Sequence, residues 1–291
     1  MTWDPDQYQR HLGLRSRPLY ELLARIPPLP GAAPRIADLG CGPGRPSLLV
    51  TERWPDARLT GYDNSPEMLA RARRHAGPTE GGGSVDFVHV DLADWRAEEQ
   101  HDLIVSNAAL QWVPRHADRF PDWVSWLRPG GVLAFQVPGN FSAPSHLLLR
   151  ELAADPRWRD RLAGVLRADE PVLSPAGYFA ALAPLGCSLD VWETTYLHVL
   201  PGEDPVLDWT KGTALRPVLT ALRDDPAARD AFLAAYRDAL RAAYPPGTHG
   251  TVFPFRRVYV VAQRRHAAQP SPQPQSSSSP QPPEESGWPS R

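Results

Sequence analysis

The sequence predicts an α/β fold with a mostly parallel sheet, and three of its features support that prediction. Strand-like and helix-like segments alternate through the first half of the 291-residue chain, which is typical of parallel strands joined by right-handed helical crossovers. The segment 102–106 (DLIVS) centres on an unbroken apolar run, as a strand buried on both faces of a sheet requires. A glycine-rich turn at 40–44 (GCGPG) joins a strand to a helix, an arrangement that forms ligand sites in many α/β folds.

Five short strand-like segments in the first half are each followed by a turn residue, and we predict that they form the parallel strands. Helices are expected between them. Pro46 suits the first turn of a helix, because its missing N–H would have no partner there. Ser65 is expected to cap the next helix, with Glu67 in the first turn. The predicted strands are 35–39, 58–62, 85–90, 102–106 and 132–137, and the predicted helices are 46–54, a helix from 66, and 120–127.

The second half, up to residue 266, is predicted to contain longer helices and two late strands. Two strands separated by a long helical stretch indicate a pair at the edge of the sheet that carries a helical insertion. The complete sheet is therefore expected to have seven strands, mostly parallel, with an antiparallel last strand. The predicted helices are 146–154, 156–167, 175–185 and most of 206–244, and the predicted strands are 188–200 and 258–263.

Composition and charge exclude several classes of protein. The 31 basic and 33 acidic side chains give a formal net charge of −2, whereas a dedicated nucleic-acid binder carries a basic face. No window approaches the ~18 apolar residues of a transmembrane helix, and the first residues lack the pattern of a signal peptide. Two cysteines are too few for a disulfide framework or a cysteine-rich metal site. We therefore expect a soluble, cytoplasmic protein with no nucleic-acid, membrane or metal partner.

The glycine-rich turn is the most informative motif. Glycine there lets the backbone approach a ligand closely and adopt dihedral angles that other residues avoid, and the following helix presents free amides. A dinucleotide site requires a third glycine at the position of Arg45, which weakens that interpretation. An acidic residue two positions before the first glycine, Asp38 before Gly40, resembles motif I of the class I S-adenosylmethionine-dependent methyltransferases, which have a Rossmann-like fold.

Acidic or amide residues follow the next strands, at positions where this family places its ligand contacts. Asp63 ends the second strand, where a carboxylate can accept hydrogen bonds from both ribose hydroxyls, a feature that NAD sites share. The resemblance implies that Asp91 contacts the adenine amino group, that the amide of Leu92 contacts the ring, and that Asn107 faces the donor methionine and the acceptor. The donor-binding residues that it implies are Asp38, Gly40, Cys41, Gly42, Gly44, Asp63, Asn64, Met68, Asp91, Leu92, Asn107, Trp112 and Arg17.

A closer resemblance extends over about residues 3–265. The segments WDPDQY, ADLGCGPG, SNAALQWVPRH, LDWTKGTALRP and FRRVYVVAQRR are similar to those of the trans-aconitate 2-methyltransferase family. That resemblance implies methyl transfer from S-adenosylmethionine to one carboxylate of trans-aconitate, or of a close tricarboxylic acid, with release of S-adenosylhomocysteine. Arg45 and Pro46 depart from the small polar pair expected after motif I, which changes the entry into the helix.

The resemblance also implies a domain organisation. A single methyltransferase domain is expected at 1–266, with a donor-binding half at about 30–137 and acceptor-side helical insertions at about 140–186 and 203–250. Residues 267–291 are rich in Pro, Ser and Gln and lack apolar periodicity, so we expect them to form a disordered tail. The chain is expected to act as a monomer or weak homodimer.

A carboxylate acceptor needs little chemical assistance. Its pKa near ~4 leaves it ionised at neutral pH, so we expect no general base, and the protein contributes orientation. The other two carboxylates need cationic partners, and arginine offers a bidentate, always-charged one. Arg216, expected in an extended segment because it precedes a proline, and Arg257, expected to begin the last strand, are the first candidates. Asn140, His146, Tyr196 and His198 complete the predicted acceptor site.

Three alternatives remain open. The same donor site can serve a hydroxyl, nitrogen or carbon acceptor, for which His146 or His198 would supply a base. A non-catalytic domain would bind S-adenosylmethionine without turnover. An NAD(P) oxidoreductase would bind a nicotinamide cofactor instead.

Overall fold

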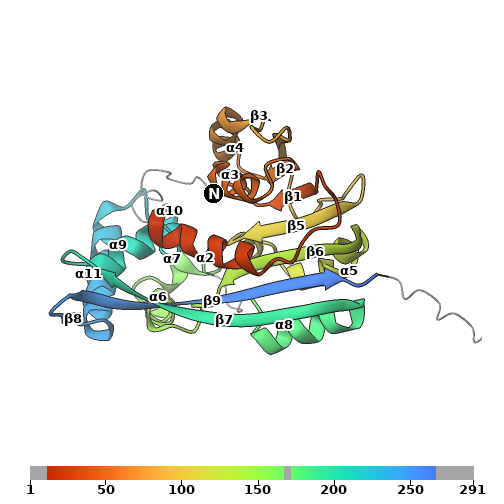
Figure 1. Cartoon of the computed structure of the whole chain (residues 1–291). Helices are drawn as coiled ribbons and strands as arrows, with labels where there is room; N and C mark the ends of the chain where they lie inside the picture. The colour runs from red at the N-terminus through yellow and green to blue at the C-terminus, as the bar shows by residue number, and fades with distance from the viewer. Residues whose placement is uncertain (1–11, 167–171, 267–291) are drawn as a thin grey trace, which may run out of the picture.

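One nine-stranded sheet organises the residues described by the computed structural model, 12–166 and 172–266 (Figure 1). Its seven longer strands are β1 (Arg35–Leu39), β2 (Arg58–Asp63), β4 (Ser84–His89), β5 (His101–Asn107), β6 (Leu127–Pro138), β7 (Cys187–Leu200) and β9 (Gly250–Arg264). Five of them run parallel in the order β4-β2-β1-β5-β6, and β9 lies antiparallel between β6 and β7. Two-residue strands, β3 (Gly77–Pro78) and β8 (Pro246–Gly247), pair with β4 and β9. The prediction of a mostly parallel sheet with an antiparallel last strand is confirmed.

Local sequence explains the turns that lead from the first strands into their helices. Gly44 precedes α3 (Arg45–Arg53) with a φ of 84°, a left-handed conformation that favours glycine. Ser65 caps α4 (Pro66–Ala72), as predicted, since its hydroxyl accepts a hydrogen bond from the amide of Met68 at 3.3 Å. Both helices carry a proline in the first turn, where a missing N–H leaves no partner unsatisfied.

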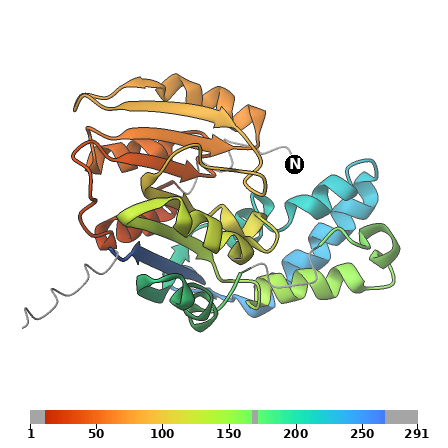
Figure 2. The same cartoon turned by 90° about the vertical axis from the view of Figure 1, so that its right-hand side faces the viewer.

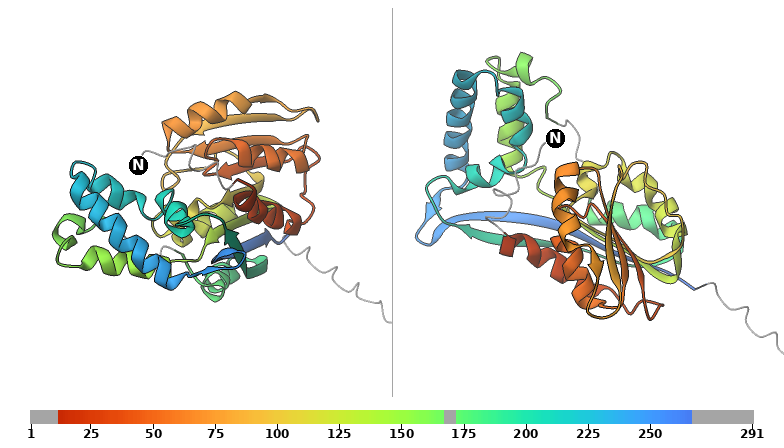
Figure 3. Two further views of the ribbon diagram at one scale, coloured as in Figure 1. Left: turned by 90° about the vertical axis from the view of Figure 1, so that its left-hand side faces the viewer. Right: turned by 90° about the horizontal axis from the view of Figure 1, so that it is seen from above.

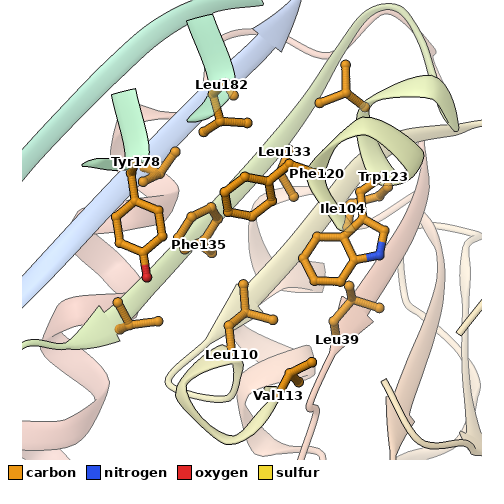
Figure 4. Close-up of a cluster of buried hydrophobic side chains, with 14 of the residues drawn as sticks. Leu39, Ile104, Leu110, Val113, Phe120, Trp123, Leu133, Phe135, Tyr178 and Leu182 are labelled. Carbon is orange, nitrogen blue, oxygen red and sulfur yellow. The ribbon is translucent and has the colours of Figure 1, made fainter. Parts of the chain in front are cut away.

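One face of the sheet is covered by α5 (Phe120–Ser125) and α8 (Pro175–Leu182). Aromatic side chains fill this layer: the rings of Phe120 and Phe135 stack with centroids 5.5 Å apart, and Tyr178 meets Phe135 edge-on at 5.1 Å. Figure 4 shows these rings converging from α5, β6 and α8. All three are inaccessible to solvent, so this layer contributes hydrophobic stabilisation together with aromatic pairing.

The opposite face is covered by α2 (Leu12–Arg25), α3 and α4. Leu19 and Leu22 of α2 join the buried cluster on this side of the sheet. The hydroxyl of Tyr196 on β7 donates to Glu21 at 2.6 Å, which ties α2 to the edge strand. The sheet is therefore buried on both faces, and this explains why its central strands β1 and β5 are buried along nearly their whole length.

A group of helices forms a lobe beyond the carboxyl ends of the parallel strands. This helical lobe consists of α6 (Pro144–Ala154), α7 (Arg159–Leu162), α9 (Pro205–Lys211), α10 (Arg216–Ala221) and α11 (Pro226–Ala243). Figure 2 and Figure 3 show it beside the sheet, and Figure 3 shows β7 and β9 extending from the sheet to reach it. Trp209, Phe232 and Phe253 belong to its buried cluster. Because Phe253 comes from β9, the long strands anchor the lobe to the sheet.

The last strand is longer than the sequence indicates. It begins at Gly250 rather than at 258, so the prediction that Arg257 begins the strand was wrong: Arg257 lies in its middle. Pro254 makes the first half of the strand hard to predict from sequence, since proline cannot donate a hydrogen bond to the neighbouring strand. Before Arg257, however, β9 has β7 but not β6 as a neighbour, so only one long ladder has to accommodate Pro254.

The helical lobe corrects two further predictions. Within 156–166, the described part of the helix predicted at 156–167, only Arg159–Leu162 is α-helical, and it lies within turns that include Gly164 at a φ of 72°. Arg216 is the first residue of α10 and does not lie in an extended segment, because Pro217 then falls in the first turn, where its missing N–H is tolerated. Within the segment 140–186, α6 and α7 contribute to the buried cluster of the lobe, whereas α8 packs on the sheet.

Some predictions fall outside the described residues, among them the tail at 267–291 and the end of the 156–167 helix. Among the helices that are described, none combines the length and the apolar character needed to cross a membrane.

Candidate active site

A cavity of about 890 Å³ opens where the parallel strands end, between the sheet and the helical lobe. Gly40 follows β1, Asp63 ends β2, Asp91 follows β4 and Asn107 ends β5, and all four line it. Ligands of open α/β sheets bind at this edge. We call this part of the cavity the strand end, and the part lined by α6, α9 and β9 the lobe end.

The glycine-rich turn forms one wall of the strand end. Gly40 and Gly42 have φ values of 82° and 57°, in the left-handed region. A Cβ atom at Gly40 would lie 2.1 Å from the Cβ of Ala109, whereas a Cβ atom at Gly42 would meet nothing within 4 Å. Gly40 is therefore required by packing, and Gly42 leaves its backbone open to the cavity. Cys41 lines the cavity between them, and burial raises the pKa of its thiol, which keeps the thiol neutral.

Asp63 connects the turn after β1 with the turn after β2. Its Oδ2 accepts a hydrogen bond from the amide of Gly42 and its Oδ1 accepts one from the amide of Ser65, both at 2.9 Å. A carboxylate has about four lone-pair sites, so Asp63 can accept further hydrogen bonds from ligand hydroxyls. Asn64, the next residue, also lines the cavity.

Apolar side chains and a carboxylate lie together in the outer part of the strand end. Leu92 and Met68 are buried, while Trp112 is 36% exposed. Asp91 is exposed, and its Oδ1 accepts a hydrogen bond from the amide of Ala93 at 2.9 Å. Leu92, Met68, Trp112 and Asp91 all line the cavity. This combination suits a flat heteroaromatic ring that carries an amino group.

Two arginines line the lobe end. Arg257 on β9 is buried, its Nη1 donates to Gln136 at 3.1 Å, and its guanidinium lies 4.8 Å from the centroid of the Phe255 ring. Arg150 on α6 is half-buried, and its Nη2 donates to the carbonyl of Phe141 at 2.9 Å. Arginine remains charged at any pH a protein tolerates, so this end of the cavity attracts anions.

The polar residues beside these arginines are uncharged. Burial, and secondarily the charge of Arg150, lower the pKa of His146 to about 4, so its imidazole is neutral at neutral pH. Asn140 accepts a hydrogen bond from the amide of Arg256 at 2.7 Å and donates one to its carbonyl at 3.1 Å. Both residues line the cavity, and Asn140 also fixes the end of β6 to β9.

Residues 36–131, which include the strand end, match the family described as "Methyltransferase domain". A trans-aconitate 2-methyltransferase of Streptomyces coelicolor is 65% identical to this chain, over 90% of this chain and 87% of its own length. A second, from Rhodococcus jostii, is 46% identical over 90% of this chain and 99% of its own length. The chain belongs to the trans-aconitate 2-methyltransferase family.

Solved structures of low sequence identity support the fold of this family member. The YcgJ protein of Bacillus subtilis has a TM-score of 0.52 at 14% identity, covering 89% of this chain and all of its own. A putative sarcosine dimethylglycine methyltransferase of Galdieria sulphuraria has a TM-score of 0.50 at 15% identity, over 91% of this chain and 92% of its own. The predictions of a class I methyltransferase fold and of a methyltransferase as the enzyme class are confirmed, which removes the oxidoreductase interpretation.

Six of the residues predicted for the site of this methyltransferase do not line the cavity. Asp38 is buried and accepts a hydrogen bond from Ser47 at 2.6 Å, and desolvation raises its pKa to about 6. It therefore joins β1 to α3. Arg17 is exposed and pairs with Glu21 at 2.7 Å. The six are Asp38, Gly44, Arg17, Tyr196, His198 and Arg216.

One of these six, His198, packs against a residue that does reach the cavity. His198 stacks on Trp209 with ring centroids 5.2 Å apart, and Trp209 lines the lobe end. Arg216 begins α10, and its neighbour Pro217 lines the cavity. Tyr196, by contrast, is directed to Glu21 of α2. His198 therefore lies behind a residue of the cavity wall, and Tyr196 joins β7 to α2.

Several residues of the lobe end were not predicted. Arg150 had a usable signal, because it lies four residues after His146 on a predicted helix and such pairs share a face. The aromatic residues had no local signal, since β9 and the lobe bring them together from distant parts of the chain. The residues missed are Phe141, Arg150, Trp209, Thr210, Thr213, Phe253 and Phe255.

Proposed function

We propose that this protein transfers the methyl group of S-adenosylmethionine to one carboxylate of trans-aconitate, or of a closely related tricarboxylic acid. The products are the monomethyl ester and S-adenosylhomocysteine. Membership of the trans-aconitate 2-methyltransferase family supports the proposal. The structural observation that carries it is one continuous cavity, with glycine and acidic residues at the strand end and two arginines at the lobe end.

The strand end fits the methyl donor by the chemistry of its residues. Asp63 can accept hydrogen bonds from the ribose hydroxyls and Asp91 one from the adenine amino group, while Leu92 and Met68 offer apolar surface to the ring. The open backbone at Gly42 lets the amino-acid part approach. Bound S-adenosylmethionine supplies an electrophilic methyl group on a sulfonium sulfur. We assign the remaining contacts to Gly40, Cys41, Asn64, Asn107 and Trp112.

The lobe end fits an acid with more than one carboxylate. Arg257 and Arg150 can each pair with one carboxylate in a bidentate fashion, which leaves the third to face the donor. Arg150 replaces Arg216, the residue predicted from sequence, as the second cationic partner. Holding the acceptor in line with the methyl group can lower the barrier by up to ~7–11 kcal/mol. His146 and Asn140 provide uncharged hydrogen-bonding surface beside the arginines.

The weak basicity of His146 favours an acceptor that is already ionised. A hydroxyl or nitrogen acceptor needs a base whose pKa lies near the working pH, and a pKa of about 4 is too low for that role. A carboxylate needs no base, because its own pKa is near ~4. We therefore favour a carboxylate over the other acceptors, and membership of a family of named methyltransferases favours catalysis over donor binding without turnover.

An assay of the purified protein with labelled S-adenosylmethionine tests the proposal. trans-Aconitate, cis-aconitate, citrate and isocitrate are compared as acceptors, and mass spectrometry identifies the product. We expect the monomethyl ester of trans-aconitate as the main product, at a rate that is flat from about pH 6 to about pH 9. Failure to bind S-adenosylhomocysteine, or a rate that rises through a pKa near ~6.5, would contradict it.

We also propose that the protein acts in the cytoplasm on a small molecule, as a monomer or weak homodimer and without a metal. The net charge of −2 and the two buried, unbridged cysteines support this setting. In the part of the chain that the structure describes, no group of three His, Cys, Asp or Glu side chains is placed to hold a metal ion. Light scattering over a range of concentrations tests the oligomeric state, and a stable higher oligomer would contradict the proposal.

A further inference from the structure

A buried glutamine connects the two ends of the cavity. Gln136 lies on β6, is inaccessible to solvent and does not line the cavity. Its neighbours on both sides do line it: Asn107 is its register partner on β5, and Arg257 lies on β9. A fully buried amide in a core strand is costly unless both of its ends are hydrogen-bonded, so its partners define its role.

Both ends of the Gln136 amide have a partner in the cavity wall. Arg257 Nη1 donates to Gln136 Oε1 at 3.1 Å. Gln136 Nε2 donates in turn to Asn107 Oδ1. The three side chains therefore form a continuous chain of hydrogen bonds from the lobe end to the strand end.

The direction of this chain is set by Arg257. A guanidinium has donors and no acceptor, so the atom of Gln136 that faces it must be the oxygen. The nitrogen of Gln136 then faces Asn107, which must present its own oxygen in return. The amide nitrogen of Asn107, Nδ2, is left for the cavity. The oxygen and nitrogen of a side-chain amide can usually be exchanged by a 180° flip. Here the guanidinium of Arg257 can only donate, so it fixes the orientation of both amides.

We propose that Gln136 is a positioning residue that makes Asn107 present its NH₂ group, and not its carbonyl oxygen, to a carboxylate in the cavity. The proposal rests on the proposed function, since the methyl donor and the acceptor acid both carry carboxylates. Arg257 and Asn107 then form a wall that offers only donors to an anion. An Asn107 turned the other way would set a carbonyl oxygen against that anion.

Gln136→Glu reverses the direction of the hydrogen bond between residue 136 and Asn107 while it keeps the shape of the side chain. Its carboxylate satisfies Arg257 and offers Asn107 a second acceptor, so Asn107 turns its NH₂ inward and its oxygen toward the ligand. We expect the affinity for the ligand carboxylate that Asn107 contacts to fall about tenfold. Calorimetric titration with S-adenosylhomocysteine measures the affinity if Asn107 contacts the carboxylate of the donor. Titration of the S-adenosylhomocysteine complex with trans-aconitate measures the affinity if Asn107 contacts a carboxylate of the acceptor.

The matched control is Gln263→Glu, the same substitution on β9 at a residue that bonds the carbonyl of Gly130 and does not line the cavity. It should leave both affinities within about twofold of wild type. In a protein that already carries Asn107→Ala, adding Gln136→Glu should lower the affinity further by less than about twofold, because the effect of Gln136 passes through Asn107. A full tenfold loss in that background, or no loss in either titration of a folded Gln136→Glu protein, overturns the proposal.

If Gln136→Glu does not fold, Asn107→Asp carries the test, because it places an oxygen toward the ligand while Gln136 remains intact. It should lower the same affinity by about tenfold or more, and an unchanged affinity overturns the proposal. Failure of the proposed function is seen separately, as a wild-type protein that binds S-adenosylhomocysteine but neither binds nor methylates trans-aconitate. The donor titration then still tests Gln136.

Discussion

The two ends of the cavity are built in different ways. At the strand end, the lining comes from backbone and short side chains at the ends of strands or in the turns after them, such as Asp63 and Gly42. At the lobe end it comes from long side chains on elements far apart in sequence, Arg150 on α6 and Arg257 on β9. The first end depends on a local motif and the second on packing between distant elements. Substitutions at each end should therefore affect different ligands.

The largest expected effect is that of Arg257→Ala. We expect kcat/KM for trans-aconitate to fall about 100-fold, because a buried cation that pairs with the substrate is lost. The affinity for S-adenosylhomocysteine should change by less than about tenfold, because Arg257 acts on the strand end only through Gln136 and Asn107. Steady-state kinetics and calorimetry measure the two quantities. Arg256→Ala is the matched control, since Arg256 pairs with Glu193 at 3.1 Å and does not line the cavity. If Arg257→Ala lowered kcat/KM for trans-aconitate and the affinity for S-adenosylhomocysteine to the same extent, the two ends of the cavity would not serve different ligands.

Asp63→Ala should produce the opposite pattern at the strand end. Loss of the carboxylate removes the acceptor for ligand hydroxyls and for the amide of Gly42. We expect the dissociation constant of S-adenosylhomocysteine to rise about 30-fold, with little change in the KM for the acceptor at saturating donor. Asp86→Ala, on the exposed side of β4, is the control. An unchanged donor affinity would remove Asp63 from the donor site.

Arg150→Ala sharpens the comparison within the lobe end. Arg150 is half-buried whereas Arg257 is buried, so solvent screens its charge more and the loss should be smaller. We expect the KM for trans-aconitate to rise about tenfold with kcat nearly unchanged, measured at saturating donor. The control is Arg157→Ala, an exposed arginine that pairs with Asp155 at 2.9 Å. If both substitutions leave KM unchanged, the second anion partner lies elsewhere.

The smallest expected effect concerns the stability of the aromatic layer that packs α5 and α8 on the sheet. His116 is buried and hydrogen-bonded to the hydroxyl of Tyr178 at 2.8 Å, and burial lowers its pKa to about 4 from 6.5. Between these values the unfolded chain binds more protons than the folded one, so stability is lost as the pH falls. From pH 6.5 to 5.5 the loss from this group is about 1 kcal/mol.

Thermal unfolding of wild type and His116→Phe over this pH range measures that contribution. Phenylalanine keeps the packing against Phe120 and Phe135 but cannot bind a proton. Its unfolding midpoint should therefore fall less steeply with decreasing pH. The same slope in both proteins would show that His116 does not titrate in this way.

The strand end could be predicted because its geometry follows from local rules. Asp63, Asp91 and Asn107 each follow a segment that the sequence predicts as a strand, and the carboxyl ends of parallel strands meet at one edge of a sheet. The same rules misplaced Asp38, whose side chain turns inward to Ser47 and not toward the cavity. Spacing along the chain indicates which residues end a strand, but the packing of α3 against β1 decides where a buried carboxylate finds its partner.

By itself the sequence determined the class of fold, the glycine-rich turn and most of the strand end, because dihedral preferences and apolar periodicity act over a few residues. Only the tertiary structure decided that Arg257 lies in the middle of β9, that Arg150 and not Arg216 shares its cavity, and that Gln136 joins Arg257 to Asn107. These relations depend on strand register and on helices packed from distant parts of the chain. A shift of one residue in the register of β5, β6 or β9 would turn Asn107, Gln136 or Arg257 to the other face of the sheet.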